Sequence, residues 1–129
     1  MQRGLSLMEL LLVVAVTGIL ASVAYPSYSD QLRRAARGEA VGLLHDAAQR
    51  LQYHYARTGQ YADSEQWQTP LPEGSRFYRL RAWREHGHYR LLAERQPQGL
   101  MARDRCGDYQ LDQAGVRANP GALDEADCW

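Results

Sequence analysis

The sequence contains no lysine: all fifteen basic residues of the 129-residue chain are arginines, and fifteen acidic residues balance them. With a formal net charge of zero, the chain as a whole favours neither nucleic acid nor any other charged partner. A glycine-rich phosphate loop, a nucleophile motif and a supported pair of catalytic carboxylates are also absent from the sequence. We therefore expect a protein that is not an enzyme and that needs no cofactor.

Only two cysteines are present, Cys106 and Cys128. A zinc site needs four ligands in short pairs, so this spacing does not predict one. His86 and His88 would need a third ligand and fall in a predicted turn, so no metal site is expected. An even cysteine count in an exported domain predicts one disulfide, whereas a cytosolic chain would keep two free thiols.

Hydrophobic residues are concentrated in residues 5–25, where Glu9 is the single charged residue. A helix of this length spans about 31 Å, the thickness of a bilayer core. The sequence after Pro26 is polar on average and is long enough for one small domain. We therefore expect a single membrane helix that carries one modest domain.

Three interpretations compete for this N-terminal segment. A cleaved secretory signal would use residues 21–24 as its small-residue cut site, and a simple membrane anchor would need only the apolar run. Neither interpretation explains Glu9, because a carboxylate inside an apolar helix is costly and usually has a partner. Neither explains why Gly4 directly precedes the apolar run.

The third interpretation comes from residues 4–14, GLSLMELLLVV, which resemble the processing site of type IV prepilins. The resemblance implies that a membrane peptidase removes the leader, residues 1–4, by cutting between Gly4 and Leu5. The same enzyme would methylate the new amino group of Leu5. This sequence has Leu5 where the family usually has phenylalanine, and its leader is short.

The resemblance also implies roles for three residues in subunit assembly. Glu9, the fifth residue of the mature chain, would pair with the terminal amine of a neighbouring subunit. Gly18 and Pro26 lie where the family weakens and kinks its long helix. Proline removes a backbone donor and clashes with the preceding turn, so we expect a bend or local unwinding between these two positions. Gly18 could instead serve a close contact between helices.

An amphipathic helix is predicted for residues 27–58, where apolar side chains recur every three or four residues. Gly59 marks its end, so one helix is expected from Leu5 to about Arg57. Residues 59–75 contain two glycines and two prolines and are predicted to form a loop, which Trp67 would pin to the core. The apolar stripe expected to pack on a sheet comprises Tyr28, Leu32, Ala36, Ala40, Leu43, Leu44, Ala47, Leu51 and Tyr55.

Three short strands are predicted from alternating patterns in residues 77–84, 89–94 and 108–112. Residues 85–87 suit a turn between the first two. Residues 76–129 are therefore expected to hold a small antiparallel sheet and a C-terminal loop closed by the disulfide. With the long helix packed on the sheet, the fold class is α+β.

The C-terminal residues add a second resemblance. Residues 106–117, the closing Cys128-Trp129 and residues 34–61 resemble PilE-like minor pilins. The resemblance implies a type IV pilin fold, with a long kinked N-terminal helix on a small antiparallel sheet. It implies a single-pass inner-membrane protein with a periplasmic head, later assembled into a pilus on the cell surface.

The implied partners are other major and minor pilins, the prepilin peptidase and methyltransferase, and an inner-membrane assembly platform. Residues 5–25 would contact the membrane. The implied functions are pilus biogenesis, twitching motility and adhesion. An abundant major pilin and a type II secretion pseudopilin are alternatives, although the acidic calcium loop of major pseudopilins is not evident.

Charge is unevenly distributed in the second half of the chain. Residues 73–105 hold eight arginines against four acidic residues, whereas residues 106–129 hold one arginine against five. Arg79, Arg81 and Trp83 are predicted to share one strand face, where they could contact a DNA backbone. This pattern suggests an alternative function, a DNA-binding minor pilin for natural transformation. In the competing interpretation, the basic face meets the acidic C-terminal loop, in the same subunit or the next.

Overall fold

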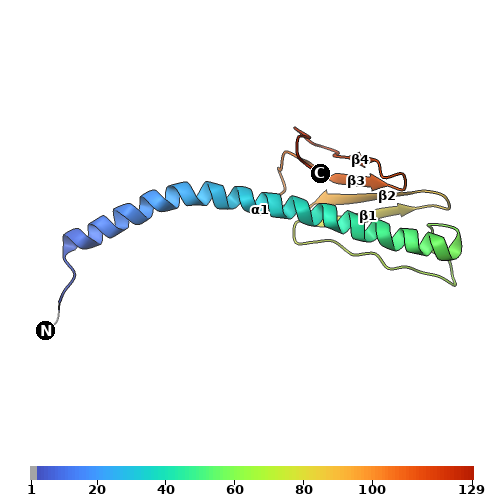
Figure 1. Ribbon diagram of the computed structural model, residues 1–129, viewed down its shortest axis with the longest axis horizontal. Helices are drawn as coiled ribbons and strands as arrows, with labels where there is room; N and C mark the ends of the chain where they lie inside the picture. The colour runs from blue at the N-terminus through green and yellow to red at the C-terminus, as the bar shows by residue number, and fades with distance from the viewer. Residues whose placement is uncertain (1–2) are drawn as a thin grey trace. The chain divides into compact units, whose positions relative to one another are not determined.

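The computed structural model describes residues 3–129, so the leader residues 1–2 lie outside the described part. One long helix, α1 (Leu7–Thr58), is followed by four strands (Figure 1). The strands are β1 (Tyr78–Arg84), β2 (Tyr89–Arg95), β3 (Tyr109–Asp112) and β4 (Arg117–Ala118). The chain divides into two compact units, one ending at Arg34 and one comprising Ala35–Trp129. We call the second unit the head and describe each unit by itself.

The first unit contains the apolar part of α1. The helix begins at Leu7, two residues later than predicted, because Ser6 acts as its N-cap: the Ser6 hydroxyl accepts a hydrogen bond from the Met8 amide at 3.2 Å. The helix then continues without interruption through Pro26, so the predicted local unwinding is wrong. Proline removes only one backbone donor, and the hydrogen bonds on either side keep the helix intact. A bend at Pro26 stays a prediction.

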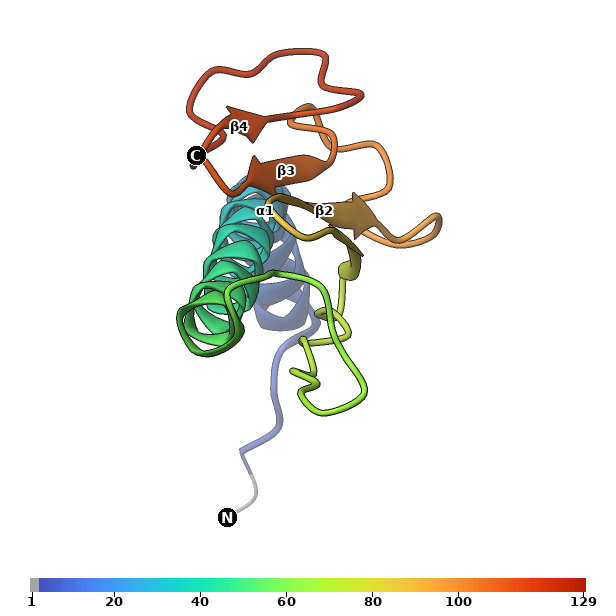
Figure 2. The ribbon, with the colours of Figure 1, turned by 90° about the vertical axis from the view of Figure 1, so that its right-hand side faces the viewer.

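In the head, α1 packs along one face of the sheet (Figure 2). Six of its side chains are buried at helical spacing: Ala36, Ala40, Leu44, Ala47, Leu51 and His54. The predicted stripe was right in its middle and wrong at its ends, since Tyr28 is 66% exposed and Tyr55 is 40% exposed. His54 takes the place predicted for Tyr55. Its ring nitrogens reach the Thr69 hydroxyl at 2.7 Å and the Ala62 carbonyl at 3.0 Å, so a polar side chain is satisfied in the core.

The sheet is antiparallel throughout, with the spatial order β1-β2-β3-β4. Three strands agree with the sequence prediction to within one residue at each end. The two-residue β4 was not predicted, because it is too short to show alternation. It forms after a turn in which Gly115 has φ 78° and Asp112 accepts two backbone hydrogen bonds. The α+β class and the long helix on a small antiparallel sheet are confirmed.

Cys106 and Cys128 form the predicted disulfide, with their Cα atoms 5.7 Å apart. Both residues are buried, which rules out the two free thiols considered above. Gly107, next to the first cysteine, has φ 65° and lies directly against the backbone of residues 120–122. A side chain at Gly107 would overlap the Pro120 carbonyl, so glycine is required there for the C-terminal loop to close.

The loop between α1 and β1 contradicts one prediction. Trp67 does not pin this loop to the core, because half of its surface is exposed. The loop is instead held by Arg84, whose guanidinium group pairs with Asp63 at 2.8 Å and donates to the Tyr61 carbonyl at 2.8 Å. The hydrogen bonds of His54 add a second attachment. Polar contacts of Arg84 and His54 therefore hold the loop, in place of the predicted contact of Trp67 with the core.

Candidate functional site

The predicted cleavage site lies in an exposed segment before α1. Residues 3–6 have no regular secondary structure, and Gly4 has open space around its Cα. Leu5 is 83% exposed. The Gly4–Leu5 bond thus lies in an exposed segment outside the helix, and cleavage there stays a prediction.

Glu9 has a local partner that the sequence analysis missed. Its carboxylate accepts a hydrogen bond from the Ser6 amide at 3.1 Å, while the Ser6 hydroxyl caps the first turn. Ser6-x-x-Glu9 thus has the sequence of a capping box and one of its two hydrogen bonds: Glu9 satisfies the Ser6 amide, while the Ser6 hydroxyl accepts from the Met8 amide rather than from that of Glu9. The serine three residues before a glutamate was the signal that could have revealed it.

The apolar half of α1 is not covered by any other part of residues 3–129. None of its most apolar window is buried, and Leu10 to Leu20 keep between 47% and 67% of each large aliphatic surface exposed. The helix is long and apolar enough to cross a membrane. A Cβ added at Gly18 would meet no atom within 4 Å among the described residues, apart from the neighbouring backbone of the helix itself. A close contact of another helix at Gly18 stays a prediction.

The outer face of β1 and β2, which points away from α1, carries the residues predicted to bind DNA. Arg79, Arg81 and Trp83 are all exposed there, as the predicted register requires. On the neighbouring strand, Arg90 lies directly opposite Trp83, and its guanidinium carbon is 4.3 Å from the ring centroid. We call this surface the basic sheet face and define it as residues 79, 81, 83, 90, 92 and 94.

Charge on the basic sheet face is only partly neutralised. Glu94 lies opposite Arg79 in the register, yet it pairs with Arg81, at 2.6 Å. Within residues 3–129, neither Arg79 nor Arg90 forms an ion pair; Arg90 lies over the Trp83 ring and opposite Asp112 of β3 in the register. Beside these arginines is a hollow of about 300 Å³, lined by Arg79, Arg81, Glu94, Arg95, Gln96 and Pro97.

The acidic C-terminal loop does not neutralise this face within the same chain. Among the acids of residues 106–129, Asp124 pairs with Arg105, at 3.8 Å, and Asp108 pairs with Arg95 at the end of β2, at 2.9 Å. In the described residues none of these acids forms an ion pair with Arg79, Arg81 or Arg90. Within one chain, the competing interpretation therefore holds for Arg95 at the end of β2 but not for the exposed arginines Arg79, Arg81 and Arg90. A contact between the basic face of one subunit and the acidic loop of the next stays a prediction.

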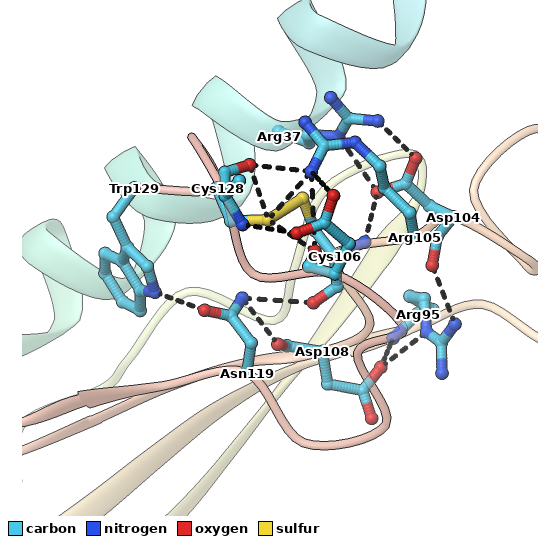
Figure 3. Close-up of a disulfide and its surroundings, with 11 residues drawn as sticks. Arg37, Arg95, Asp104, Arg105, Cys106, Asp108, Asn119, Cys128 and Trp129 are labelled. Carbon is cyan, nitrogen blue, oxygen red and sulfur yellow. Dashed lines mark hydrogen bonds and ion pairs between the residues drawn. A yellow bond between two sulfur atoms is a disulfide. The ribbon is translucent and has the colours of Figure 1, made fainter.

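A buried ion pair holds the helix, the disulfide and the loop before β3 together (Figure 3). Arg37 donates to both carboxylate oxygens of Asp104, at 2.9 and 2.7 Å, and the Asp104 side chain is 2% exposed. Burial alone would raise the pKa of Asp104, but the hydrogen bonds from Arg37 and the Cys106 amide outweigh it, so the pKa is lowered. These hydrogen bonds also raise the pKa of Arg37. The pair stays ionised at any physiological pH.

Neighbouring contacts extend this cluster to the C-terminus. Arg95 pairs with Asp108 at 2.9 Å, and the Trp129 indole donates to Asn119 at 2.8 Å. Asn119 in turn donates to the carbonyls of Cys106 and Asp108. The cluster is structural, because each of these groups is occupied by another residue of the chain.

Metal binding has no support in residues 3–129, where no group of three or more His, Cys, Asp or Glu side chains could hold an ion. His86 and His88 lie in the turn between β1 and β2, as predicted. His88 contacts Glu85 at 3.0 Å, and His86 contacts Gln60 at 3.2 Å.

Known proteins match this chain in both of its halves. Residues 1–25 match the prokaryotic N-terminal methylation motif. Residues 26–110 match the family described as "Type IV minor pilin ComP, DNA uptake sequence receptor". This second match covers about two thirds of the sequence and most of the head.

Among curated proteins, the type IV major pilin protein PilE1 of Neisseria gonorrhoeae is 36% identical over 64 residues, which is 50% of this chain and 39% of that protein. The type IV major fimbrial protein FimA of Dichelobacter nodosus is 46% identical over 43 residues, 33% of this chain and 27% of FimA. The matched segments thus span well under half the length of these relatives.

Among solved structures, a type IV pilin from Shewanella oneidensis superposes with a TM-score of 0.50 at 26% identity, covering 78% of this chain and 97% of that one. The minor pilin PilV of Neisseria meningitidis gives the same TM-score at 18% identity, covering 70% and 92%, which bears on the fold alone. With the methylation motif, the exposed apolar helix and the disulfide-closed head in place, the chain belongs to the ComP family of type IV minor pilins.

Proposed function

We propose that this minor pilin is cut between Gly4 and Leu5, methylated at Leu5 and built into a pilus by its apolar helix. The observation that carries the proposal is the helix itself, which is apolar, unburied and preceded by an accessible Gly4–Leu5 bond. Such a helix leaves the bilayer only if like helices replace the lipid around it. Other pilins, the prepilin peptidase and an assembly platform are the partners, and the role is structural rather than catalytic.

Glu9 would change partners during this process. In the uncut chain its carboxylate caps the Ser6 amide. Cutting creates a positive amine at Leu5, and in a low-dielectric bundle the amine of a neighbouring subunit attracts the carboxylate more strongly than a neutral amide does. Pairing of Glu9 with that amine would fix the register between subunits.

Two substitutions separate the capping role from the pairing role. Glu9→Gln keeps a side chain that completes a capping box but removes the negative charge. Glu9→Ala removes both. If pairing matters, both variants are processed normally and both fail to enter pili. Normal incorporation of Glu9→Gln would refute the pairing and leave capping as the sole function of Glu9.

The assembly proposal is tested by mass spectrometry of pili sheared from cells. A methylated peptide that starts at Leu5 in this fraction supports processing and incorporation, and its amount relative to the main subunit measures abundance. A processed chain found only in membranes would contradict incorporation and favour a type II secretion pseudopilin.

A second candidate function, binding of double-stranded DNA, is favoured by one specific surface. The basic sheet face presents Arg79 without an acidic partner and Arg90 stacked on Trp83, beside a hollow. Arginines bind phosphate oxygens as bidentate donors, and stacking on an aromatic ring holds the guanidinium group in place. The family to which the chain belongs is described as a DNA uptake sequence receptor, which supports the same function.

The DNA proposal is tested by titrating the full chain, in micelles of a non-ionic detergent, with duplex DNA at several salt concentrations. Loss of one phosphate contact reduces the salt dependence by about one unit of slope, so Arg79→Ala with Arg90→Ala should reduce it by about two. Arg103→Ala, at an exposed arginine between β2 and β3, is the matched control. Binding that is absent at low salt, or equal in the double variant and the control, would refute the proposal.

A further inference from the structure

The C-terminal loop displays a leucine that its own chain does not cover. Leu123 is 88% exposed, the highest value among the large hydrophobic side chains of the described residues. Asp124, Glu125 and Asp127 follow it and are also exposed. Of these three acids, only Asp124 has an ion-pair partner within residues 3–129. The loop therefore presents an apolar side chain and two acids without an ion-pair partner side by side, and a basic surface with an exposed apolar group would complement both.

This loop is held in one conformation by its own chain. The Leu123 amide donates to the Arg105 carbonyl at 2.8 Å, and the Arg105 guanidinium donates to the Ala126 carbonyl at 2.6 Å. The disulfide closes the loop, and its start at residues 120–122 packs against Gly107. Because the loop is already ordered, binding through it costs little conformational entropy.

The basic sheet face has the complementary chemistry. It offers the unpaired Arg79 and the stacked Arg90, and it is partly apolar because Trp83 is 42% exposed. The hollow beside Arg79 is large enough to receive a side chain of the size of leucine or glutamate. Opposite charges and apolar groups are thus available on two surfaces of the same molecule.

The two surfaces cannot meet within one chain. The basic sheet face lies on β1 and β2, whereas the C-terminal loop follows β4 at the other edge of the sheet (Figure 2). Three strand spacings separate the outer strands, which is roughly 14 Å. The contacts of Arg105 and the disulfide keep the loop at its own edge.

We propose that the C-terminal loop of one copy docks on the basic sheet face of a second copy of this chain, with Leu123 against Trp83 and Glu125 near Arg79. The contact uses two different surfaces and is therefore heterologous. Each copy keeps one free loop and one free face, so the contact propagates head to tail. The proposal does not depend on DNA binding.

The test uses two charge variants of the full chain in micelles, after nuclease treatment. The face variant carries Arg79→Glu and Arg90→Gln, and the loop variant carries Glu125→Arg and Asp127→Asn. The substitutions change the net charge by three units in opposite directions. Asparagine is chosen at position 127 because Asp127 has φ 55°, a conformation that asparagine tolerates. Sedimentation velocity at low and high salt measures the association.

Wild-type chains should associate at low salt and separate at high salt. Each variant alone should associate at least about tenfold more weakly, since like charges then face each other. An equimolar mixture should regain association, because the acidic face of one variant meets the basic loop of the other. Recovery in the mixture also shows that both variants are folded.

A second pair of variants tests the apolar part of the contact. Leu123→Ser should weaken association, whereas Val116→Ser, at a 60% exposed valine in the turn before β4, should not. Salt-independent association that all variants share equally would overturn the proposal, because it would come from the apolar helices. Failure of the mixture to recover, or equal effects of the two serine variants, would also overturn it.

Discussion

The buried pair of Arg37 and Asp104 makes a strong prediction about the stability of the head. Two hydrogen bonds join the side chains, which are 11% and 2% exposed, and Asp104 accepts a third hydrogen bond from the Cys106 amide (Figure 3). Arg37→Met keeps most of the aliphatic volume but leaves the carboxylate without its cation. Removing one member of a buried pair costs about 3–5 kcal/mol. We expect about 3 kcal/mol, because the edge of Arg37 reaches solvent.

The cost should depend on pH with a defined sign. In the wild type the pKa of Asp104 lies below its unfolded value, so the pair stabilises the head above about pH 4, and this stability is lost as the pH falls through the folded pKa. In Arg37→Met, burial dominates and should raise the pKa of Asp104 above its unfolded value. The charged carboxylate then destabilises the variant as the pH rises. The difference between the two proteins should be largest near neutral pH and should shrink toward pH 3.

The assay is unfolding of the full chain in micelles, followed by near-ultraviolet circular dichroism between pH 3 and pH 7. For a head of this size, a loss of about 3 kcal/mol lowers Tm by roughly 12 °C or more. Adding Asp104→Asn to Arg37→Met should restore part of the loss, because it removes the uncompensated charge. A loss below about 1 kcal/mol, or one that is equal at both pH limits, would refute the reasoning.

Three further predictions concern the same region of the head. Replacing both Cys106 and Cys128 with serine should cost about 3 kcal/mol from the chain entropy of the loop, measured by urea unfolding against the oxidised wild type. Gly107→Ala should destabilise the head by more than 1 kcal/mol, since φ is 65° and Cβ would meet the Pro120 carbonyl; a stability unchanged by the substitution would contradict this. Burial raises the pKa of Tyr109 from 10.0 to about 12, so its contribution to the free energy of unfolding should be constant below about pH 10 and fall as the pH rises toward 12, with a smaller fall in Tyr109→Phe.

The parts of the fold that depend on local pattern were predictable. The apolar run and the alternation in β1 and β2 are patterns of consecutive residues. They predicted the start of α1 and the bounds of both strands to within two residues. The disulfide followed from the cysteine count and the expected export. The strand β1 was placed in the correct phase, so Arg79 and Trp83 emerged on one exposed face.

The remainder depends on contacts between distant residues. His54 and Tyr55 both continue the helical stripe of Leu51, and only the returning loop, with Thr69 and Ala62, selects histidine for the core. Arg37 and Asp104 are 67 positions apart, so no local pattern links them. The hydrogen bond between Glu9 and the Ser6 amide, in contrast, is local, because the two residues are three positions apart. The sequence analysis considered only a partner for Glu9 in another subunit.

The proposed DNA binding and the proposed docking of a second copy both use the basic sheet face, so the two partners cannot bind it at the same time. Arg79 and Arg90 would bind phosphate groups in one and the acidic loop of a second copy in the other. Since one guanidinium group cannot satisfy both partners, DNA and the second copy should compete, and the competition must be reciprocal in free energy. If both proposals hold, duplex DNA dissociates the associated chains, and the apparent DNA affinity falls as the protein concentration rises. The loop variant, which cannot mask the face, should then bind DNA at least as tightly as the wild type.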